Sequence, residues 1–214
     1  GYRQRHYGTV LVGGQELFRE AKNGLFYRLI CVASGEIDGF VEHRLGDQVF
    51  TFSPVYPYPA IEEPIDGSMF IDTRLGLDLQ DSYQQLMDAF PGVWTEDHRC
   101  NGLATVLVTA KDVGKYNADV YQGNVLQWRG LLRGAKLYDS RDADHDPDDR
   151  STWTHNDTAA LCIQDFCTHR DGMGWSLADL DLPSWRDAAD MHEEAVALKT
   201  GGTEKRYRLS GSYH

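Results

Sequence analysis

The side chains best suited to chemistry are gathered in an acidic segment at residues 142–149, which reads Asp-Ala-Asp-His-Asp-Pro-Asp-Asp. Carboxylates at every second position are typical of the start of a calcium-binding loop, where hard oxygen ligands converge on one ion. Two residues depart from that pattern, because Pro147 replaces the glycine of the sharp turn and Trp153 replaces the closing bidentate glutamate. The departures favour a solvated acidic loop, and a cation-binding adhesion or interaction module is the alternative.

The cysteines lack the spacing of a metal or disulfide motif. The four are Cys31, Cys100, Cys162 and Cys167. The one close pair lies in a predicted helix, where about 100° of rotation per residue separates two side chains five positions apart by about 140°. Cys31 lies within an apolar run and Cys100 shortly before another, as is usual for cysteine used as a small apolar residue. We expect buried free thiols, with no disulfide and no bound metal.

Hydrolytic chemistry has no recognisable motif in the chain. Ser176 lacks the glycines of a nucleophile elbow, Ser34 has only one, and the histidines fall in no hydrolase pattern. Carboxylate pairs are unavoidable among 33 acidic residues, so a cell-wall hydrolase is retained as a minor alternative. We predict a protein that is not an enzyme and assign no catalytic, cofactor-binding or metal-ligating residue and no cofactor.

The charge and length of the chain limit its partners. The formal net charge is −12, so recognition of nucleic acid through lysine and arginine contacts with phosphate is not expected, although an acidic wall would repel DNA passing through a conduit. The longest apolar run covers residues 29–33, far short of the roughly 20 needed to span a bilayer. A chain of 214 residues is long enough to bury about 70% of its unfolded surface without covalent staples.

The first two thirds of the chain predict mainly strands. Alternating and β-branched residues predict strands at 7–12, 25–33, 39–45, 49–52, 68–75, 103–110, 125–128 and 135–138. The pairs Asp38-Gly39 and Gly46-Asp47 are expected to be hairpin turns, which would make the first strands an antiparallel meander. Prolines predict an irregular loop or arm at 53–67. A helix is expected at 81–90 with Tyr83, Leu86, Met87 and Phe90 on its apolar face.

The last third predicts two helices and a closing strand at 205–211. The first helix is expected to be capped by Asn156 or Asp157 and to end near His169. Its apolar stripe comprises Ala159, Ile163, Phe166 and Cys167. The second helix is expected to begin at Pro183 and to end at Gly201-Gly202. Its apolar side comprises Trp185, Ala188, Ala189, His192, Ala195 and Val196, and its solvent side Asp187, Asp190, Glu193 and Glu194.

His192 lies on the apolar side of the second predicted helix. No second histidine stands one turn away to complete a metal pair, so we expect His192 to be a satisfied core or interface residue.

A succession of short blocks gives the chain a family resemblance. The blocks are WTEDHRCNGLATVLV from Trp94, AKLYDSRD from Ala135, HNDTAALCIQDFCT from His155 and RYRLSG from Arg206. Upstream come Arg3, Tyr7 and Gly8, then Gly13-Gly14, GEIDGF from Gly35, and Leu75, Gly76 and Gln80. Their order resembles that of the tail hub of long-tailed bacteriophages, the tip attachment or host specificity protein J family of lambda-like phages. The sequence departs from the family at Ser140, where the family element Tyr-Asp-Pro-Arg has proline.

The resemblance implies an α+β fold, an antiparallel β-rich hub with tail-tube-like β-barrel or sandwich elements and a few short flanking helices. It also implies a virion location at the tail tip, where a homotrimer closes the tail tube. The implied partners are other copies of the chain, the distal tail ring and tube proteins, the fibre or receptor-binding parts, and DNA as non-specific passing cargo. We expect three segments, 1–53 as a meander, 54–140 as mixed β with one helix, and 141–214 as acidic loop, helices and closing strand. Because the chain starts with glycine, we also expect it to be part of a longer polypeptide.

Overall fold

The computed structural model describes residues 4–50, 52–53, 60–61, 68–117, 121 and 127–213. The chain divides into two compact units, which we describe separately and call the sheet unit, Leu11–Leu132, and the helical unit, Tyr2–Val10 with Arg133–His214. Most of the loop predicted at 53–67 and half of the strand predicted at 125–128 lie outside the described residues, as does Arg3. The three-segment organisation stays a prediction.

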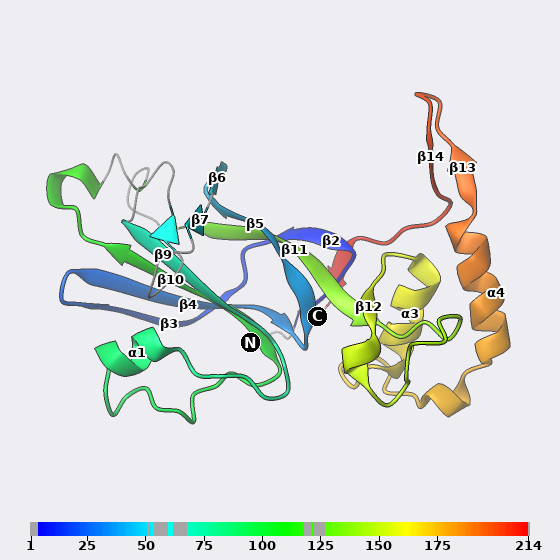
Figure 1. The fold of residues 1–214 in the computed structure, drawn as a ribbon, viewed down its shortest axis with the longest axis horizontal. Coiled ribbons are helices and arrows are strands. Elements are labelled where there is room, and N and C mark those ends of the chain that lie inside the picture. Colours follow the sequence, from blue (N-terminus) through cyan, green and yellow to red (C-terminus); the bar gives the residue numbers. More distant parts are fainter. Residues whose placement is uncertain are drawn as a thin grey trace. The chain divides into compact units, whose positions relative to one another are not determined.

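The larger sheet of the sheet unit has the strand order β3-β4-β10-β9-β8-β7, with antiparallel pairing (Figure 1). The strands are β3 (Gln15–Lys22), β4 (Leu25–Ser34), β7 (Phe52–Ser53), β8 (Ala60–Ile61), β9 (Met69–Leu75) and β10 (Leu103–Lys111). Asn23 and Gly24 join β3 to β4 with φ angles of 53° and 74°, the backbone that a two-residue hairpin requires. Strand β3 was not predicted, because all its residues except Phe18 are exposed and no apolar alternation marks it.

Helix α1 (Gln84–Ala89) packs against one face of this sheet (Figure 1). The predicted apolar face is confirmed, since its four residues join a core cluster with strand residues. The other buried members of this cluster are Tyr27, Leu29, Trp94 and Leu107. Two polar pairs tie the helix region to β10: the hydroxyls of Tyr83 and Thr105 lie 2.7 Å apart, and Thr109 donates to the Gln85 side chain at 2.8 Å. The helix is therefore positioned both by apolar burial and by buried hydrogen bonds.

A second sheet has the order β12-β11-β5-β6, with β2 also paired to β11. Its strands are β2 (Thr9–Val12), β5 (Ile37–Leu45), β6 (Gln48–Phe50), β11 (Trp128–Leu137) and β12 (Thr154–His155). The turn predicted at Gly46-Asp47 is confirmed, but Asp38-Gly39 lies inside β5 and is not a turn. The chain turns instead at Gly35, whose φ is 82° and whose N–H donates to the carbonyl of Gly102 at 2.8 Å. The predicted continuous meander is therefore wrong, because β4 and β5 belong to different sheets.

The helical unit combines two helices with two small strand pairs. Its elements are β1 (Arg5–Tyr7), α3 (Ala159–Thr168), α4 (Leu182–Glu193), β13 (Ala195–Ala197), β14 (Thr203–Lys205) and β15 (Gly211–Tyr213). Strand β1 pairs antiparallel with β15, so the first and last described strands of the chain lie side by side. The core of this unit consists of Tyr7, Ala135, Leu137, Ala160, Leu161, Cys162 and Ala189, with Phe166, Trp185, Ala188, Leu209 and Tyr213 packed against it.

The two predicted helices exist, but their faces and ends differ from the predictions. In α3, Ile163 is exposed, while the side chain of Asp165 is buried because it pairs with a buried arginine. Helix α4 includes Pro183 in its first turn as predicted, but it ends at Glu193. Gly201 and Gly202 then form the turn between β13 and β14, and the predicted strand at 205–211 is replaced by β14 and β15.

Short 3-10 turns complete the chain. They are η1 (Gly114–Tyr116), η2 (Arg150–Thr152) and η3 (Leu177–Asp179). The architecture is α+β and mostly antiparallel, as predicted, with three short α-helices among the described residues. The described strands form open sheets, and a closed barrel stays a prediction. None of the described helices has the length and apolar character to cross a membrane.

Candidate functional site

Hydrogen bonds from backbone amides to aspartate side chains within the acidic loop at 142–149 fix its conformation. Asp142 accepts a hydrogen bond from the amide of Asp144 at 3.0 Å, and Asp146 accepts one from the amide of Asp148 at 2.9 Å. Asp149 caps η2 by accepting from the amide of Ser151 at 2.9 Å. Aspartate side chains that bind the backbone two residues on are characteristic of tight turns. The loop is therefore a series of aspartate turns with its carboxylates exposed, and no group of three or more metal-ligating side chains is present among the described residues.

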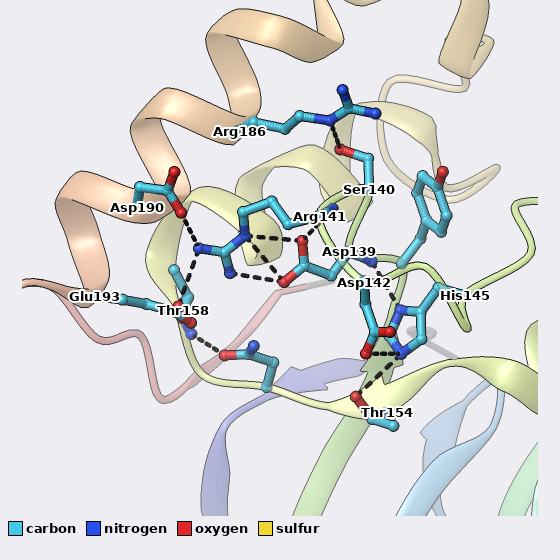
Figure 2. Close-up of polar contacts among 12 residues, drawn as sticks. Asp139, Ser140, Arg141, Asp142, His145, Thr154, Thr158, Arg186, Asp190 and Glu193 are labelled. Carbon is cyan, nitrogen blue, oxygen red and sulfur yellow. Dashed lines mark hydrogen bonds and ion pairs between the residues drawn. The ribbon is translucent and has the colours of Figure 1, made fainter.

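The buried ring of His145 connects this loop to the chain before and after it. Its side chain is buried, and its Nδ1 accepts a hydrogen bond from the amide of Asp139 at 3.0 Å (Figure 2). On the other side of the ring, Nε2 lies 3.5 Å from a carboxylate oxygen of Asp142 and 3.4 Å from the hydroxyl of Thr154. The indole of Trp153 donates to the carbonyl of Asp146 at 2.7 Å. Trp153, expected to be the residue that spoils a calcium site, is thus a structural support of the loop.

Arg141 is the centre of a cluster that joins the loop to α4 (Figure 2). Its guanidinium lies 2.6 Å from the Asp139 carboxylate, 2.8 Å from that of Asp190 and 3.0 Å from that of Glu193. Arg186 of the same helix donates to the Ser140 hydroxyl at 3.1 Å. Asp190 and Glu193 lie on the predicted polar side of α4 and both contact Arg141, in the segment that follows β11; Asp190 stays 70% exposed, whereas Glu193 is 30% exposed.

Glu193 also joins the cluster to the β13–β14 hairpin. It accepts a hydrogen bond from the Thr158 hydroxyl at 2.6 Å, and the Lys205 ammonium lies 3.2 Å away. Lys205 lies 3.4 Å from Asp157, which also pairs with Arg208 at 2.5 Å. These side chains border an open hollow of about 520 Å³. Asp157 therefore pairs with cations rather than capping α3, for which the N-cap residue is Thr158.

The electrostatics of this cluster keep its carboxylates and its guanidinium ionised. Burial disfavours ionisation of Glu193, but hydrogen bonds from Arg141, Thr158 and Lys205 outweigh it and lower the pKa of this carboxyl to about 2. Burial likewise opposes ionisation of Asp139, and its bonds to Arg141 still hold its pKa below the ordinary value. The hydrogen bond to Asp139 is the main cause of the raised pKa of Arg141. Carboxylates held ionised by guanidinium partners fix the geometry of a unit and are unsuited to exchanging protons near neutral pH.

A second polar cluster lies in the core of the helical unit. The Arg5 guanidinium donates to both carboxylate oxygens of Asp165 at 2.7 and 2.9 Å, and the Tyr7 hydroxyl donates to the same carboxylate at 2.6 Å. Burial and the neighbouring Asp165 both raise the pKa of Tyr7. Sequence pattern alone does not pair these residues, because they are 160 positions apart. Arg5 belongs to none of the sequence blocks, whereas Asp165 belongs to the block that begins at His155.

The remaining predicted residues have structural surroundings. His192 accepts a hydrogen bond from the amide of Ala160 at 2.9 Å and contacts the ring of Tyr207, which confirms the expectation of a satisfied histidine. Ser176 caps η3 in a capping box with Asp179. All the cysteines are free, as predicted, although Cys31 and Cys100 are only partly buried. Burial raises the pKa of Cys31 to about 11 and is also the main cause that raises the pKa of Cys162 to about 12.

Gln80 connects the sequence blocks that carry the family resemblance. Its side-chain amide donates to the carbonyls of Arg99, Cys100 and Leu103, at 3.1, 2.7 and 3.1 Å. Its side-chain oxygen accepts from the amide of Gly76 at 3.0 Å. Gly76 has a φ of 89°, and a Cβ there would come within 2.4 Å of the Gly35 carbonyl oxygen. The blocks that begin at Gly35, Leu75 and Trp94 thus meet at one point.

Comparisons with known proteins find a shared fold. No protein-family model matches the chain, and no curated protein matches it. Among solved structures, the chain is similar to one in the virion of a native gene transfer agent particle, with a TM-score of 0.51 and 10% sequence identity. The match covers 95% of this chain and 52% of that one, so this chain spans about half the length of the structure it resembles. At this identity the likeness shows the fold alone.

Proposed function

We propose that this chain is a structural component of a phage-type virion and forms part of the tail-tip hub that closes the tail tube. The observation that carries the proposal is the fold similarity to a chain of a gene transfer agent virion over 95% of this chain. The resemblance of the sequence blocks to those of tail hub proteins supports the same assignment, and three of these blocks meet around Gln80 and Gly76. In this proposal the hub is a homotrimer that contacts the distal tail ring, the tube and the host-recognition parts, and DNA passes through its ring.

The proposed role is non-catalytic. In the Arg141 cluster the carboxylates are bound by arginine and lysine, so this cluster holds the segment after β11, α4 and the β13–β14 hairpin together. Zymography on peptidoglycan with the purified chain tests the hydrolase alternative. A zone of lysis that disappears when the chain is heat-denatured would overturn the non-catalytic role, and an intact gel supports it.

Immunogold microscopy of particles carrying an epitope on this chain tests the location. The exposed turn at Gly201-Gly202 is a suitable insertion site because it lies at the tip of the β13–β14 hairpin. We expect gold at the distal end of the tail and about three copies per particle by quantitative mass spectrometry, the number that the proposed closed homotrimer contains. Label on the capsid, or purified particles without the chain, would refute the proposal. Particles with the same epitope on a capsid protein are the control.

A further inference from the structure

The β13–β14 hairpin, which extends beyond the end of α4, exposes an apolar strand edge (Figure 1). Among the described strands β13 pairs only with β14, so its other edge has no strand partner there. Residues 195–198 read Ala-Val-Ala-Leu, and all of them are exposed. Native proteins usually protect such an edge with lysine, proline or a bulge. These four residues include no lysine or proline and the register has no shift, so the edge is suited to pairing with a further strand.

Hydrogen bonds within the hairpin show which residues face the open edge. The carbonyl of Glu194 accepts from the amide of Arg206 at 2.9 Å, and the amide of Leu198 donates across the turn at 3.0 Å. Backbone groups of successive strand residues point to opposite edges, and those of Glu194 and Leu198 face β14. The N–H and C=O groups of Ala195 and Ala197 therefore point to the open edge.

Strand β3 lies at one end of the larger sheet and offers a second open edge. Its register shift lies before Phe18, so the regular part of this edge runs from Phe18 to Lys22. The two-residue turn that follows bonds Lys22 to β4, so by alternation the backbone groups of Arg19 and Ala21 point to the open edge. All residues of β3 except Phe18 are exposed, which leaves the edge accessible.

The two edges match in one antiparallel register. In this register the residues that direct backbone groups to the two open edges face each other, as strand pairing requires. The opposite pairs are Ala195 with Ala21, Ala197 with Arg19, Glu194 with Lys22, Val196 with Glu20, and Leu198 with Phe18. An acidic residue thus meets a basic one at one end of the contact, and two apolar residues meet at the other. Both kinds of cross-strand pair stabilise a sheet.

A shift of two residues, the smallest that keeps the backbone groups opposite each other, removes this match. In one direction Glu194 comes to lie opposite Glu20, which places like charges together. In the other direction Lys22 comes to lie opposite Val196, and Glu194 passes the end of β3. The side chains therefore select one register.

We propose that the open edge of β13 is a strand-addition site and that its occupant is the β3 edge of a second copy of this chain. Glu194 stays 55% exposed although Arg206 binds it within the hairpin, so its carboxylate is accessible to the Lys22 ammonium of the other copy. The contact joins two different surfaces, so it is heterologous and can close a ring of copies. This inference rests on the proposed multi-copy assembly and names a contact within it.

Disulfide trapping between two chains tests the register. Glu20→Cys and Val196→Cys are made in separate chains, so a bond between the introduced thiols joins two copies. These positions would form a non-hydrogen-bonded pair, whose Cα atoms lie about 4.5 Å apart, within reach of a disulfide. Under a mild oxidant the mixture should give a product of twice the chain mass in a non-reducing gel. Glu20→Cys mixed with Glu204→Cys, opposite Val196 on β14, is the matched control and should not. Each variant alone controls for reaction of the native cysteines.

A charge exchange tests the polar end of the contact. Lys22→Glu and Glu194→Lys should each weaken self-association roughly tenfold in sedimentation at low salt, because like charges then meet. A mixture of the two variants should associate as the parent chain does, since each offers the edge that the other requires. Lys199→Glu reverses a charge at an exposed position outside the paired segment and should have no effect.

Ala197→Pro tests whether the contact is made by backbone pairing. Proline removes the amide that faces the open edge and leaves the hydrogen bonds to β14 in place, so association should be lost. Thr203→Pro is the matched control, because Thr203 lies opposite Ala197 and its amide faces the other edge of the same hairpin. Association of this control should be unchanged, and circular dichroism verifies that every variant is folded.

The proposal is overturned if Glu20→Cys and Val196→Cys give no cross-link, if the control cross-links equally, or if mixing the charge variants restores no association. Association that is lost in Ala197→Pro without any cross-link would mean that another strand occupies this edge, which overturns the assignment to β3. Gold at the tail tip without a cross-link refutes the contact alone, whereas a cross-link with gold on the capsid refutes the tail-tip role.

Discussion

Arg5 and Asp165 are 160 positions apart in the sequence, yet their side chains form a two-pronged ion pair with N···O distances of 2.7 and 2.9 Å. Both side chains are more than nine-tenths buried. The pair joins β1 to α3, and Tyr7 adds a third hydrogen bond to the same carboxylate. A buried pair of this kind specifies which segments meet, because each charge left alone would be strongly disfavoured in the core.

Replacing one member of this pair should destabilise the protein strongly. Asp165→Ala leaves the Arg5 guanidinium buried without a counter-charge, and we expect a loss of about 3–5 kcal/mol in the free energy of unfolding by urea denaturation. Glu194→Ala, which removes the exposed partner of Arg206, is the control and should cost less than about 1 kcal/mol. Equal effects of the two substitutions would contradict the assigned role of the buried pair.

Two buried histidines should make the protein lose stability in mild acid. Burial lowers the pKa of His43 to about 4, and burial together with Arg5 does the same for His169. Both histidines are therefore neutral in the folded chain, while the unfolded chain takes up protons below its ordinary pKa of about 6.5. Stability should be complete above about pH 6.5 and should fall between about pH 6.5 and 4.

His43→Gln isolates the contribution of one of these histidines. Glutamine offers an acceptor in place of Nδ1, which receives the Trp128 indole N–H at 3.1 Å, but it does not titrate. The variant should show a flatter fall in the free energy of unfolding between about pH 6.5 and 4, by on the order of 2 kcal/mol. An unchanged slope would show that His43 is not responsible.

The contribution of the Arg141 cluster to the free energy of unfolding should be lost at a lower pH than that of the histidines. Because the pKa of Glu193 is lowered to about 2, this carboxyl stabilises the fold above its ordinary value, near 4.5, and that contribution is lost as the pH falls toward 2. Glu193→Gln should flatten the stability profile in this window. Glu204→Gln, at an exposed position of β14, should leave the profile as it is.

Gln80 should be needed for the fold where the sequence blocks meet. Gln80→Leu keeps a similar volume but leaves the Gly76 amide and three carbonyls without their partner, so we expect a loss of about 2–3 kcal/mol in stability. The control is Gln84→Leu, which removes an exposed contact to Asp88 at the start of α1. Thermal unfolding of both variants measures the difference. A loss confined to the control would refute the role given to Gln80.

The wall of the proposed DNA conduit should carry net negative charge. From net charge we predict that Glu36, Asp38, Asp47 and Asp72 face the lumen, whereas Asp187, Asp190 and Glu194 face outward. Asp47 and Asp72 are each paired with an arginine, which offsets part of the charge that they would present. Placing the chain in a reconstruction of the tail tip and counting charges within about 8 Å of the axis checks this. A positive inner surface would refute the lumen assignment and leave the hub proposal standing.

Local patterns in the sequence were sufficient for most strands and for α1, because apolar alternation and helical spacing reflect burial directly. These patterns did not predict elements that are exposed or contacts that are made by buried polar side chains. Strand β3 is exposed and therefore carries no apolar alternation, and only the Asn23-Gly24 pair beside it is typical of a hairpin. Asp38-Gly39 has turn composition, but hydrogen bonding in the sheet keeps it extended.

The polar clusters were the least predictable part of the candidate site. The helical pattern places Glu193 on the polar side of its helix but indicates no partner for it, and only the path of the chain after β11 brings Arg141 to it. Pairing of Arg5 with Asp165 joins β1 to α3 across 160 positions of sequence, which no local spacing encodes. The contacts of Gln80 could not be predicted either, because its partners are backbone carbonyls, which every residue has whatever its side chain.

The antiparallel pairing of β1 with β15 has a mechanical consequence. Arg5 lies opposite Tyr213, so the chain enters and leaves this pair at the same end. Tension applied to the N-terminal side of β1 and the C-terminal side of β15 would separate the two strands from one end, breaking their hydrogen bonds one after another instead of all together. The contact next to this pulled end is the buried ion pair of Arg5 with Asp165. Resistance of the helical unit to pulling would then depend on one ion pair more than on the length of the strands.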